Sequence, residues 1–431
     1  MRGPCSGIWK YVNAGAALKR MSFTPVKPKR VSPYVALHYR DYRLFFFGQL
    51  ISNAGTQMQM VTINWHIYML TGSALALGLT GLARIVPIIA FSLIGGVFAD
   101  AHDRKRVLLF TQSSMLIFAV ILALVTSIGK ASPAAIYLLS ALTAAASAFD
   151  NPARNSLAPN LVPREHLTNA LSLNSVLVRT SSIIGPGMAG FVIARFGIAA
   201  VYWFNAISFI AVLIALIMIK APTQEHLGRT RVTFGAFAEG IRYARQSTIV
   251  FATILLDFLA SFFSSASALL PIFANEILKV GPQGLGLLYA AQPAGALIAG
   301  AAISFIGNVK RQGLVFLTAL AIYGLATALY GGSRWFAISL VFLALIGVAD
   351  GTSSIMRNTI RQLATPDNLR GRAQSLNAMF VMGGPQLGNL EAGAVAALWG
   401  APFSVISGGV ATVITVALTF WLAPQVRDYR G

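Results

Sequence analysis

Five charged side chains lie within long apolar stretches of this 431-residue sequence and are its best candidates for chemistry. They are Arg84, Arg179, Asp257, Asp350 and Glu391. A charge within a lipid bilayer is costly, so such residues usually face a cavity or a charged partner. A carboxylate there can exchange protons, and an arginine can bind an anion or balance an acid. We expect a proton-coupling or substrate site among them, with buried structural ion pairs as the alternative.

Two uncharged polar residues extend this set of candidates. Gln57 and Asn64 are seven residues apart, so they share one face of a helix. Polar residues within a membrane span usually point inward, toward a cavity or a neighbouring helix. Both residues are therefore predicted to line a substrate cavity, although amides also serve in ordinary helix packing.

A second cluster of charges stands where an apolar stretch ends. It reads Gly96-Val-Phe-Ala-Asp100-Ala-His-Asp103-Arg104-Lys105-Arg106, an acid followed by basic residues at a helix end. Charges at such a position can pair with another helix and later release it. Asp150 and Arg154 lie at a corresponding helix end, four residues apart, and can also pair with each other as a weak surface ion pair.

The cluster that begins at Gly96 resembles the signature loop of the major facilitator superfamily, with Ala101 in place of an Arg and Asp103 in place of a Gly. An acidic residue at position 103 resembles the sequences of one branch of the superfamily, which includes the enterobactin exporter and related secretion permeases. Residues 71–78 and 149–154 also resemble that branch, and the resemblance covers about residues 38–425. It implies a cytoplasmic gate made by Asp100, Arg104 and Lys105, with Asp150 as the partner and Arg154 beside it.

A third motif contains Gly185, Pro186 and Gly190. It resembles, in part, the motif that marks drug/proton antiporters in the same superfamily. Proline removes a backbone donor and small residues permit close packing, so a helix bend is expected, with plain helix packing as the alternative.

The resemblance implies a secondary active transporter that exports small, partly lipophilic molecules, such as a siderophore, drug or metabolite, by alternating access and proton antiport. In the superfamily, spans one, four, seven and ten line the cavity, so Asp257 is the first choice as coupling acid and Glu391 the second. Alternatives are an importer or uniporter on the same fold, or a membrane sensor that does not transport. An enzyme is not expected, because no clustered catalytic constellation is present.

The elements that must position these residues are transmembrane helices. The sequence is 56% hydrophobic and 11% charged, a composition that a soluble protein cannot cover with polar surface. Twelve apolar segments are long enough to cross a bilayer as helix: 43–70, 75–100, 107–128, 134–160, 167–194, 199–219, 248–275, 284–307, 312–331, 336–362, 373–398 and 402–422. We therefore predict an all-α membrane protein with twelve transmembrane helices.

An internal repeat divides these helices into two sets. Arg154, Asn155, Pro163, Ala170, Ser172, Leu173 and Asn174 recur 203 residues later, as Arg357, Asn358, Pro366, Ala373, Ser375, Leu376 and Asn377. Such a repeat indicates two pseudo-symmetric six-helix bundles with a site between them. Because Asp150, Arg179 and Glu391 have no charged counterpart, we expect the shared residues to be scaffold and the function to lie where the repeat breaks.

The predicted domains are a basic tail (1–42), a bundle (43–219), a linker (220–247), a second bundle (248–422) and a short tail (423–431). Four basic residues fall in predicted outer loops and two within spans, so 27 of the 33 Lys and Arg residues are cytoplasmic. This positive-inside asymmetry places both termini in the cytoplasm of an inner-membrane protein. The net charge of +20 is thus explained by basic residues that face the anionic lipids of the inner leaflet. A nucleic-acid partner is not expected.

Cys5 is the only cysteine, which rules out an intramolecular disulfide and a cysteine metal cluster. No cofactor and no metal site are expected. The sequence contains no Walker-type phosphate-binding motif, so energy must come from an ion or substrate gradient or a partner chain. A monomer is expected, with a small molecule and protons as its transported partners.

Overall fold

The computed structural model describes residues 34–220, 247–265, 267–307, 309–366 and 370–430. Within these ranges every regular element is a helix, as the sequence predicts. Most of the predicted tail over 1–42 and of the predicted linker over 220–247 lies outside the described residues. We call residues 34–220 the first half of the chain and residues 247–430 the second half.

The described part of the first half contains six long helices. They are α2 (Arg40–Thr71), α3 (Ala74–Ala101), α4 (Arg104–Ser127), α5 (Pro133–Leu157), α6 (Leu167–Phe196) and α7 (Ile198–Met218). Local chemistry sets their ends: Ser73 and Asp103 accept hydrogen bonds from the first free amides of α3 and α4. Gly72 ends α2 in the left-handed conformation, at φ 58°, which glycine adopts without strain.

The second half repeats this order with one interruption. Its helices are α9 (Thr248–Phe263), α10 (Leu270–Ile272), α11 (Gly281–Ile306), α12 (Gln312–Gly332), α13 (Phe336–Ala364), α14 (Arg370–Trp399), α15 (Ala401–Leu422) and the short α16 (Pro424–Arg427). The predicted span 248–275 falls within one candidate membrane segment, Thr248–Ile277, which is not a single continuous helix. α9 ends at Phe263, and the chain continues as a 3₁₀ turn (Ser267–Leu269), α10 and a π-helical turn (Phe273–Ile277).

The break coincides with a group of serines. Serines recur at positions 264, 265 and 267, and serine side chains compete with the helix for backbone hydrogen bonds. Ser265 donates to the carbonyl of Pro385, and both Ser265 and Ser267 donate to Asn389 on α14. The polar groups freed by the break are thus satisfied by a neighbouring helix rather than by lipid.

Ten segments are long and apolar enough to cross a membrane among the described residues. α2 and α14 match the others in length but are not among the ten, because amide, hydroxyl and charged residues lower their hydropathy. Large apolar side chains cover the outside of the molecule, for example Phe305 at 92% and Trp421 at 77% exposure. The chain is therefore a multi-pass membrane protein.

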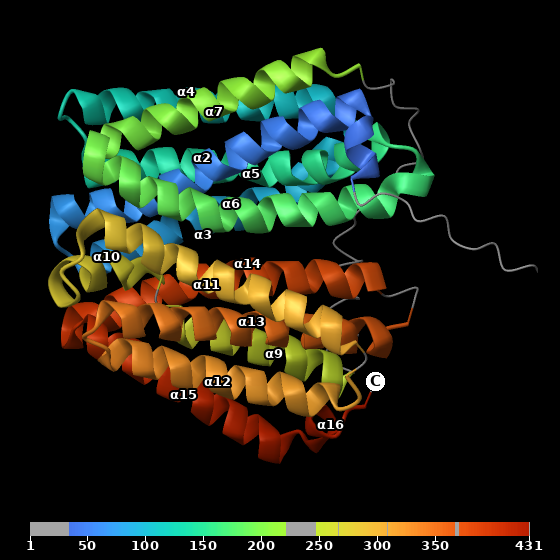
Figure 1. The fold of residues 1–431 in the computed structure, drawn as a ribbon, viewed down its shortest axis with the longest axis vertical. Helices are drawn as coiled ribbons and strands as arrows, with labels where there is room; N and C mark the ends of the chain where they lie inside the picture. Colours follow the sequence, from blue (N-terminus) through green and yellow to red (C-terminus); the bar gives the residue numbers. More distant parts are fainter. Residues whose placement is uncertain (1–33, 221–246, 266, 308, 367–369, 431) are drawn as a thin grey trace, which may run out of the picture.

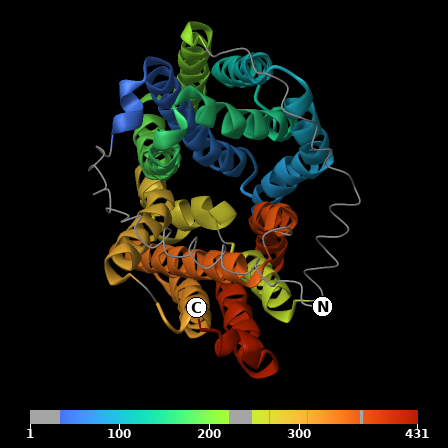
Figure 2. The ribbon, with the colours of Figure 1, turned by 90° about the vertical axis from the view of Figure 1, so that its right-hand side faces the viewer.

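The helices form two groups that follow the chain order (Figure 1). α2 to α7 pack against one another on one side, and α9 to α15 on the other, also in the view turned by 90° (Figure 2). Two helix pairs join the groups: α3 packs along α14, and α6 packs along α11. These two helix pairs form the contact between the two groups.

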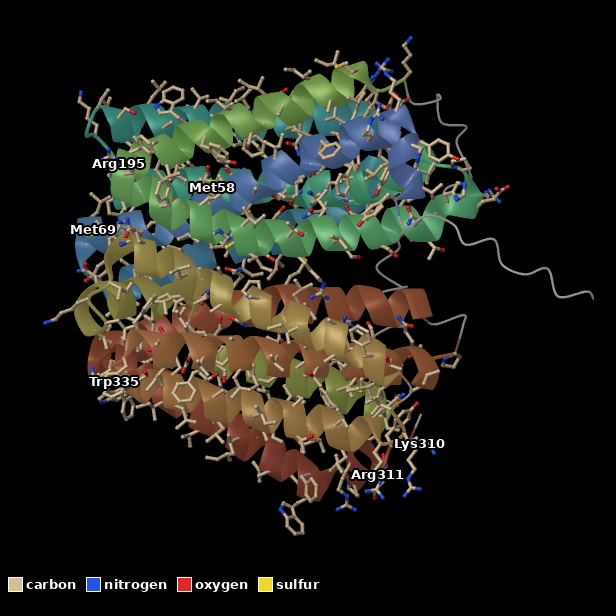
Figure 3. All side chains as sticks on the ribbon, viewed as in Figure 1. Met58, Met69, Arg195, Lys310, Arg311 and Trp335 are labelled. Atoms are coloured by element: carbon tan, nitrogen blue, oxygen red, sulfur yellow. The ribbon has the colours of Figure 1, made fainter. Side chains whose placement is uncertain are left out.

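The described chain begins and finishes at one end of the molecule, which we call the terminal end (Figure 1). Lys310 and Arg311 also lie at this end, whereas Met69, Arg195 and Trp335 lie at the opposite end, which we call the far end (Figure 3). The far end carries the turns at Gly72, Gly197 and Gly400.

Candidate functional site

A cavity of about 360 Å³ lies between the two halves. Its walls come from α2, α3, α5 and α6 of the first half and from α11, α13 and α14 of the second. The polar lining is mostly Ser, Thr, Asn and Gln, mixed with apolar residues such as Met60, Val61 and Pro293. Arg84 and Asp350 are the charged residues that line it among the described side chains. A mixed cavity of this size suits a small, partly lipophilic molecule.

The structure brings four predicted site residues together here: Gln57, Asn64, Arg84 and Asp350 all line the cavity. The remaining three are placed elsewhere. Asp257 is buried within the second half, at 4% exposure, while Arg179 lies exposed on α6. Glu391 is half-buried on α14 and makes no hydrogen bond or ion pair with the described residues. Asp257, the first choice from the sequence, does not face the cavity.

Asp257 instead belongs to a charge network around Arg357. The Nη1 atom of Arg357 lies 3.0 Å from Oδ1 of Asp257 on α9 and 3.8 Å from Oδ1 of Asp350 on α13. The side chain of Asp257 is 5% exposed and that of Asp350 is 43% exposed. One guanidinium therefore connects a buried carboxylate to a carboxylate that opens onto the cavity.

Arg361 extends this network by one helical turn. Its Nε donates to the backbone carbonyl of Arg357 at 3.1 Å, and its Nη atoms donate to Asn358 and to Asn377 on α14. The two arginines thus lie beside the two acids, and the hydrogen bonds to Asn377 tie the cluster to α14. Charges held this closely in an apolar interior respond together when one of them is neutralised.

Arg154 forms the matching arrangement in the first half. Its Nη1 donates to Gln49 at 3.1 Å and to Asn53 at 3.5 Å, both on α2, and Asn53 precedes Asp257 by 204 residues. Its carboxylate partner is Asp150, at 3.8 Å on its own helix. Arg154 and Arg357 therefore each contact the first helix of their half. The acidic partner of Arg154 lies on its own helix, whereas Asp257, the nearest acid to Arg357, lies on that first helix. Arg357, one of the repeated residues, thus takes part in the charge network of the second half.

Asp150 is held inside the first half. It accepts hydrogen bonds from Thr111 Oγ1 at 2.9 Å and Gln112 Nε2 at 2.8 Å, in addition to the ion pair with Arg154. Arg104 does not reach it, and donates instead to the carbonyl of Ser156 at 2.9 Å. The alternative pairing of Asp150 with Arg154 is the one that this conformation contains.

The rest of the predicted gate loop binds a helix end. Lys105 Nζ donates to the carbonyl of Ile219 at 2.6 Å, just beyond the end of α7, where free carbonyls attract a cation. The side chain of Asp100 lies outside the described residues, as does the surrounding of Gly96. The loop therefore connects α4 to α5 and α7 within one half.

The predicted bend motif is used for close packing. α6 continues through Pro186 as one helix. A Cβ atom on Gly185 would lie 2.6 Å from Cβ of Gln57, and one on Gly190 would lie 2.4 Å from the carbonyl oxygen of Pro282. Gly190 thus meets α11 of the other half, next to Gly286. The motif provides a contact between the halves, in line with the packing alternative.

Three side-chain hydrogen bonds join the halves among the described residues, and all involve the last part of α2. Asn64 donates to Tyr289 OH at 2.8 Å, Tyr68 OH donates to Glu276 at 2.7 Å, and Asn275 donates to Tyr68 OH at 3.1 Å. Tyr68 lies one turn before the far end. Sequence reasoning missed Tyr289 and Glu276, since neither shows a partner in the linear sequence.

Comparisons with known proteins show the family to which this chain belongs. The family described as transmembrane secretion effector matches residues 31–428. The enterobactin exporter of Escherichia coli (strain K12) is 28% identical over 393 residues, which cover 90% of this chain and 93% of the exporter. The same exporter of Shigella boydii serotype 18 matches equally, at 28% identity.

Solved structures share the fold at low sequence identity. A bacterial homologue of the iron transporter ferroportin, in an inward-facing state, matches with a TM-score of 0.70 and 16% identity, over 90% of this chain and 99% of that one. A bacterial homologue of the human lysosomal transporter Spinster, inward-facing and unoccupied, matches with a TM-score of 0.73 and 14% identity, over 90% and 98%. The fold of this chain is thus that of major facilitator transporters.

Proposed function

This chain belongs to the transmembrane secretion effector family of the major facilitator superfamily, and from that membership we propose that it exports small, partly lipophilic molecules as a secondary active transporter. Its twelve long helical segments would cross the inner membrane as two pseudo-symmetric six-helix bundles. The basic residues gathered toward the terminal end support a cytoplasmic location for both termini. The far end then faces outward.

One observation carries the transport mechanism: the side-chain hydrogen bonds between the halves are all formed by the last part of α2, near the far end, among the described residues. The cavity lies between the same two halves. Two rigid halves joined at one end can rock about that contact and expose a central site to either side in turn. The conformation described here is then the one open to the cytoplasm.

The energy source that we propose is a proton gradient, with Asp350 as the acid that takes up the proton. Asp350 opens onto the cavity and shares Arg357 with the buried Asp257. A proton on Asp350 would weaken its hold on Arg357 and leave that arginine to Asp257. Because Arg357 and Asp350 lie on α13 and Asp257 lies on α9, the change reaches both helices. The sequence-based first choice, Asp257, becomes the internal partner in this scheme.

The cargo is best sought in the growth medium. We would compare, by mass spectrometry, the small molecules released by the parent strain, a deletion strain and the deletion strain complemented with wild-type protein. A molecule lost on deletion and restored by complementation is the substrate. The similarity to the enterobactin exporter supports a siderophore or another secreted metabolite as the first class to examine.

Transport is then tested with purified full-length protein in liposomes loaded with that molecule. An imposed pH gradient should accelerate efflux from wild-type vesicles, and an ionophore that removes the gradient should abolish the acceleration. Equal efflux with and without the gradient would contradict proton antiport. Net efflux driven by the substrate gradient alone would indicate a uniporter instead.

A further inference from the structure

Arg84 is a charge without a counter-charge. It lies on α3, lines the cavity, and its side chain makes no hydrogen bond or ion pair within the described part of the chain. Three acids of the two halves have their own arginine partners: Asp150 is paired with Arg154, and Asp257 and Asp350 with Arg357. Because an arginine inside a membrane protein is costly, an unpaired one facing a cavity indicates a ligand.

Ser140 is a second, independent sign of a ligand at the same wall. Its side chain lines the cavity at 6% exposure, and its Oγ atom has no hydrogen-bond partner among the described residues. A buried hydroxyl that makes no hydrogen bond destabilises the fold. A hydroxyl of this kind can donate a hydrogen bond to a bound acceptor.

The two residues lie on neighbouring helices, between the same two contacts. α3 and α5 run side by side, with the Tyr137 hydroxyl bonded to the carbonyl of Ala76 near one end and Gly95 packed against Ala148 nearer the other. Arg84 and Ser140 both fall between these two contacts. A guanidinium and a free hydroxyl on adjacent helices suit one acidic group, because both donate hydrogen bonds to oxygen.

We propose that the transported molecule carries an anionic oxygen group, a carboxylate, sulfonate or phosphate, and that Arg84 and Ser140 bind it on the first-half wall of the cavity. That the bound molecule is transported rests on the proposed function, whereas the binding of an anion at this site does not. The charge of Arg84 favours the anion over a neutral isostere, and a hydrogen bond from Ser140 orients the anionic group. The apolar lining accepts the remainder of the molecule.

A matched pair of probes tests the site by binding alone. Naphthalene-2-sulfonate and naphthalene-2-sulfonamide have nearly the same shape, and only the first is charged at pH 7. Each is titrated calorimetrically into the purified full-length chain in detergent, with detergent alone as the blank. We expect the sulfonate to bind about tenfold more tightly than the sulfonamide, which is a modest gain for a charge-assisted contact.

Variants assign the difference to Arg84. In Arg84→Gln the preference for the sulfonate should fall below about twofold, whereas Arg84→Lys should keep most of it. Arg195→Gln is the matched control, since Arg195 lies exposed at the far end of α6 and is not among the lining residues, and it should bind like the wild type. Ser140→Ala should weaken the sulfonate by about threefold and leave the sulfonamide unchanged.

Two results would overturn the proposal. One is equal binding of the two probes to the wild type, which decides the matter even if Arg84→Gln does not fold. The other is a sulfonate preference that survives in Arg84→Gln. If phosphatidylglycerol displaces the sulfonate from the wild type whereas water-soluble glycerol phosphate does not, the site holds a lipid headgroup and the assignment to a diffusible molecule is wrong.

The test separates this inference from the proposed export. Anion-selective binding without any efflux from liposomes would support the site and contradict the transporter function. Proton-driven efflux together with equal binding of the charged and the neutral probe would support the transporter function and contradict the anion site.

Discussion

Arg357 on α13 and Asp257 on α9 form an ion pair, at 3.0 Å between Nη1 and Oδ1, inside the second half of the chain. Both side chains are less than a tenth exposed. Removal of one member leaves the other charged and desolvated, and such losses cost about 3–5 kcal/mol. The pair therefore stabilises the fold in addition to any part it takes in coupling.

We predict that Arg357→Ala lowers the melting temperature of the purified protein in detergent far more than Asp257→Ala/Arg357→Ala does. The double variant removes both members of the buried pair, so only Asp350, which is 43% exposed, loses its partner. Melting is followed by the intrinsic tryptophan fluorescence of the full-length chain. Arg427→Ala is the control, because its partner Asp428 is largely exposed and such pairs contribute little. Equal melting of the single and double variants would show that the pair is not coupled.

The second prediction concerns Asp350. Asp350→Asn keeps the size of the side chain but cannot release a proton, so efflux in liposomes should lose its acceleration by the pH gradient. Counterflow of the substrate, which needs no net proton movement, should remain within about twofold of the wild type. Asp428→Asn is the matched acid-to-amide control at an exposed position. Gradient-driven efflux that persists in Asp350→Asn would exclude Asp350 as the coupling acid.

Much of the fold could be predicted from the sequence, because hydropathy over twenty residues reports directly on a transmembrane helix. The break after Phe263 could not, since it depends on Asn389, a hydrogen-bond acceptor over 120 residues away. The site shows the same limit. Arg84 and Gln57 were found because an isolated polar residue in an apolar stretch is a local signal. Arg357 was set aside as scaffold, because only the folded chain places it between Asp257 and Asp350.

The third prediction addresses the contact at the far end. Tyr68→Phe removes the hydroxyl that binds both Glu276 and Asn275 across the two halves. A hydrogen bond to a charged group contributes about 1.5–3 kcal/mol, so the population with the far end open should rise by about tenfold or more. Tyr137→Phe is the control, because it removes a similar bond within the first half, to the carbonyl of Ala76.

The population is measured as a distance between two spin labels, one on a cysteine at Lys130 and one at Arg334. Both residues are exposed, and each lies in a turn at the far end, one in each half. The natural Cys5 is first replaced by serine, which leaves no other cysteine to label. An unchanged distance distribution in Tyr68→Phe would show that this contact does not hold the far end closed.

The fourth prediction uses two glycines of α6 that differ in what surrounds them. A Cβ atom on Gly190 would lie 2.4 Å from the carbonyl oxygen of Pro282 and 3.0 Å from Gly286, both on α11 of the other half. A Cβ atom on Gly187 would meet nothing within 4 Å. Because backbone atoms cannot yield as a flexible side chain does, Gly190→Ala must push α6 and α11 apart, at a cost of about 1–3 kcal/mol.

We expect Gly190→Ala to disfavour the conformation described here, in which the far end is closed, and to slow efflux at least fivefold. The same pair of spin labels should report a larger share of the long distance in this variant. Gly187→Ala should match the wild type in both measurements, which removes the general effect of an added methyl group on helix stability. If both variants transport equally, the close approach of Gly190 and Gly286 does not limit the transport cycle.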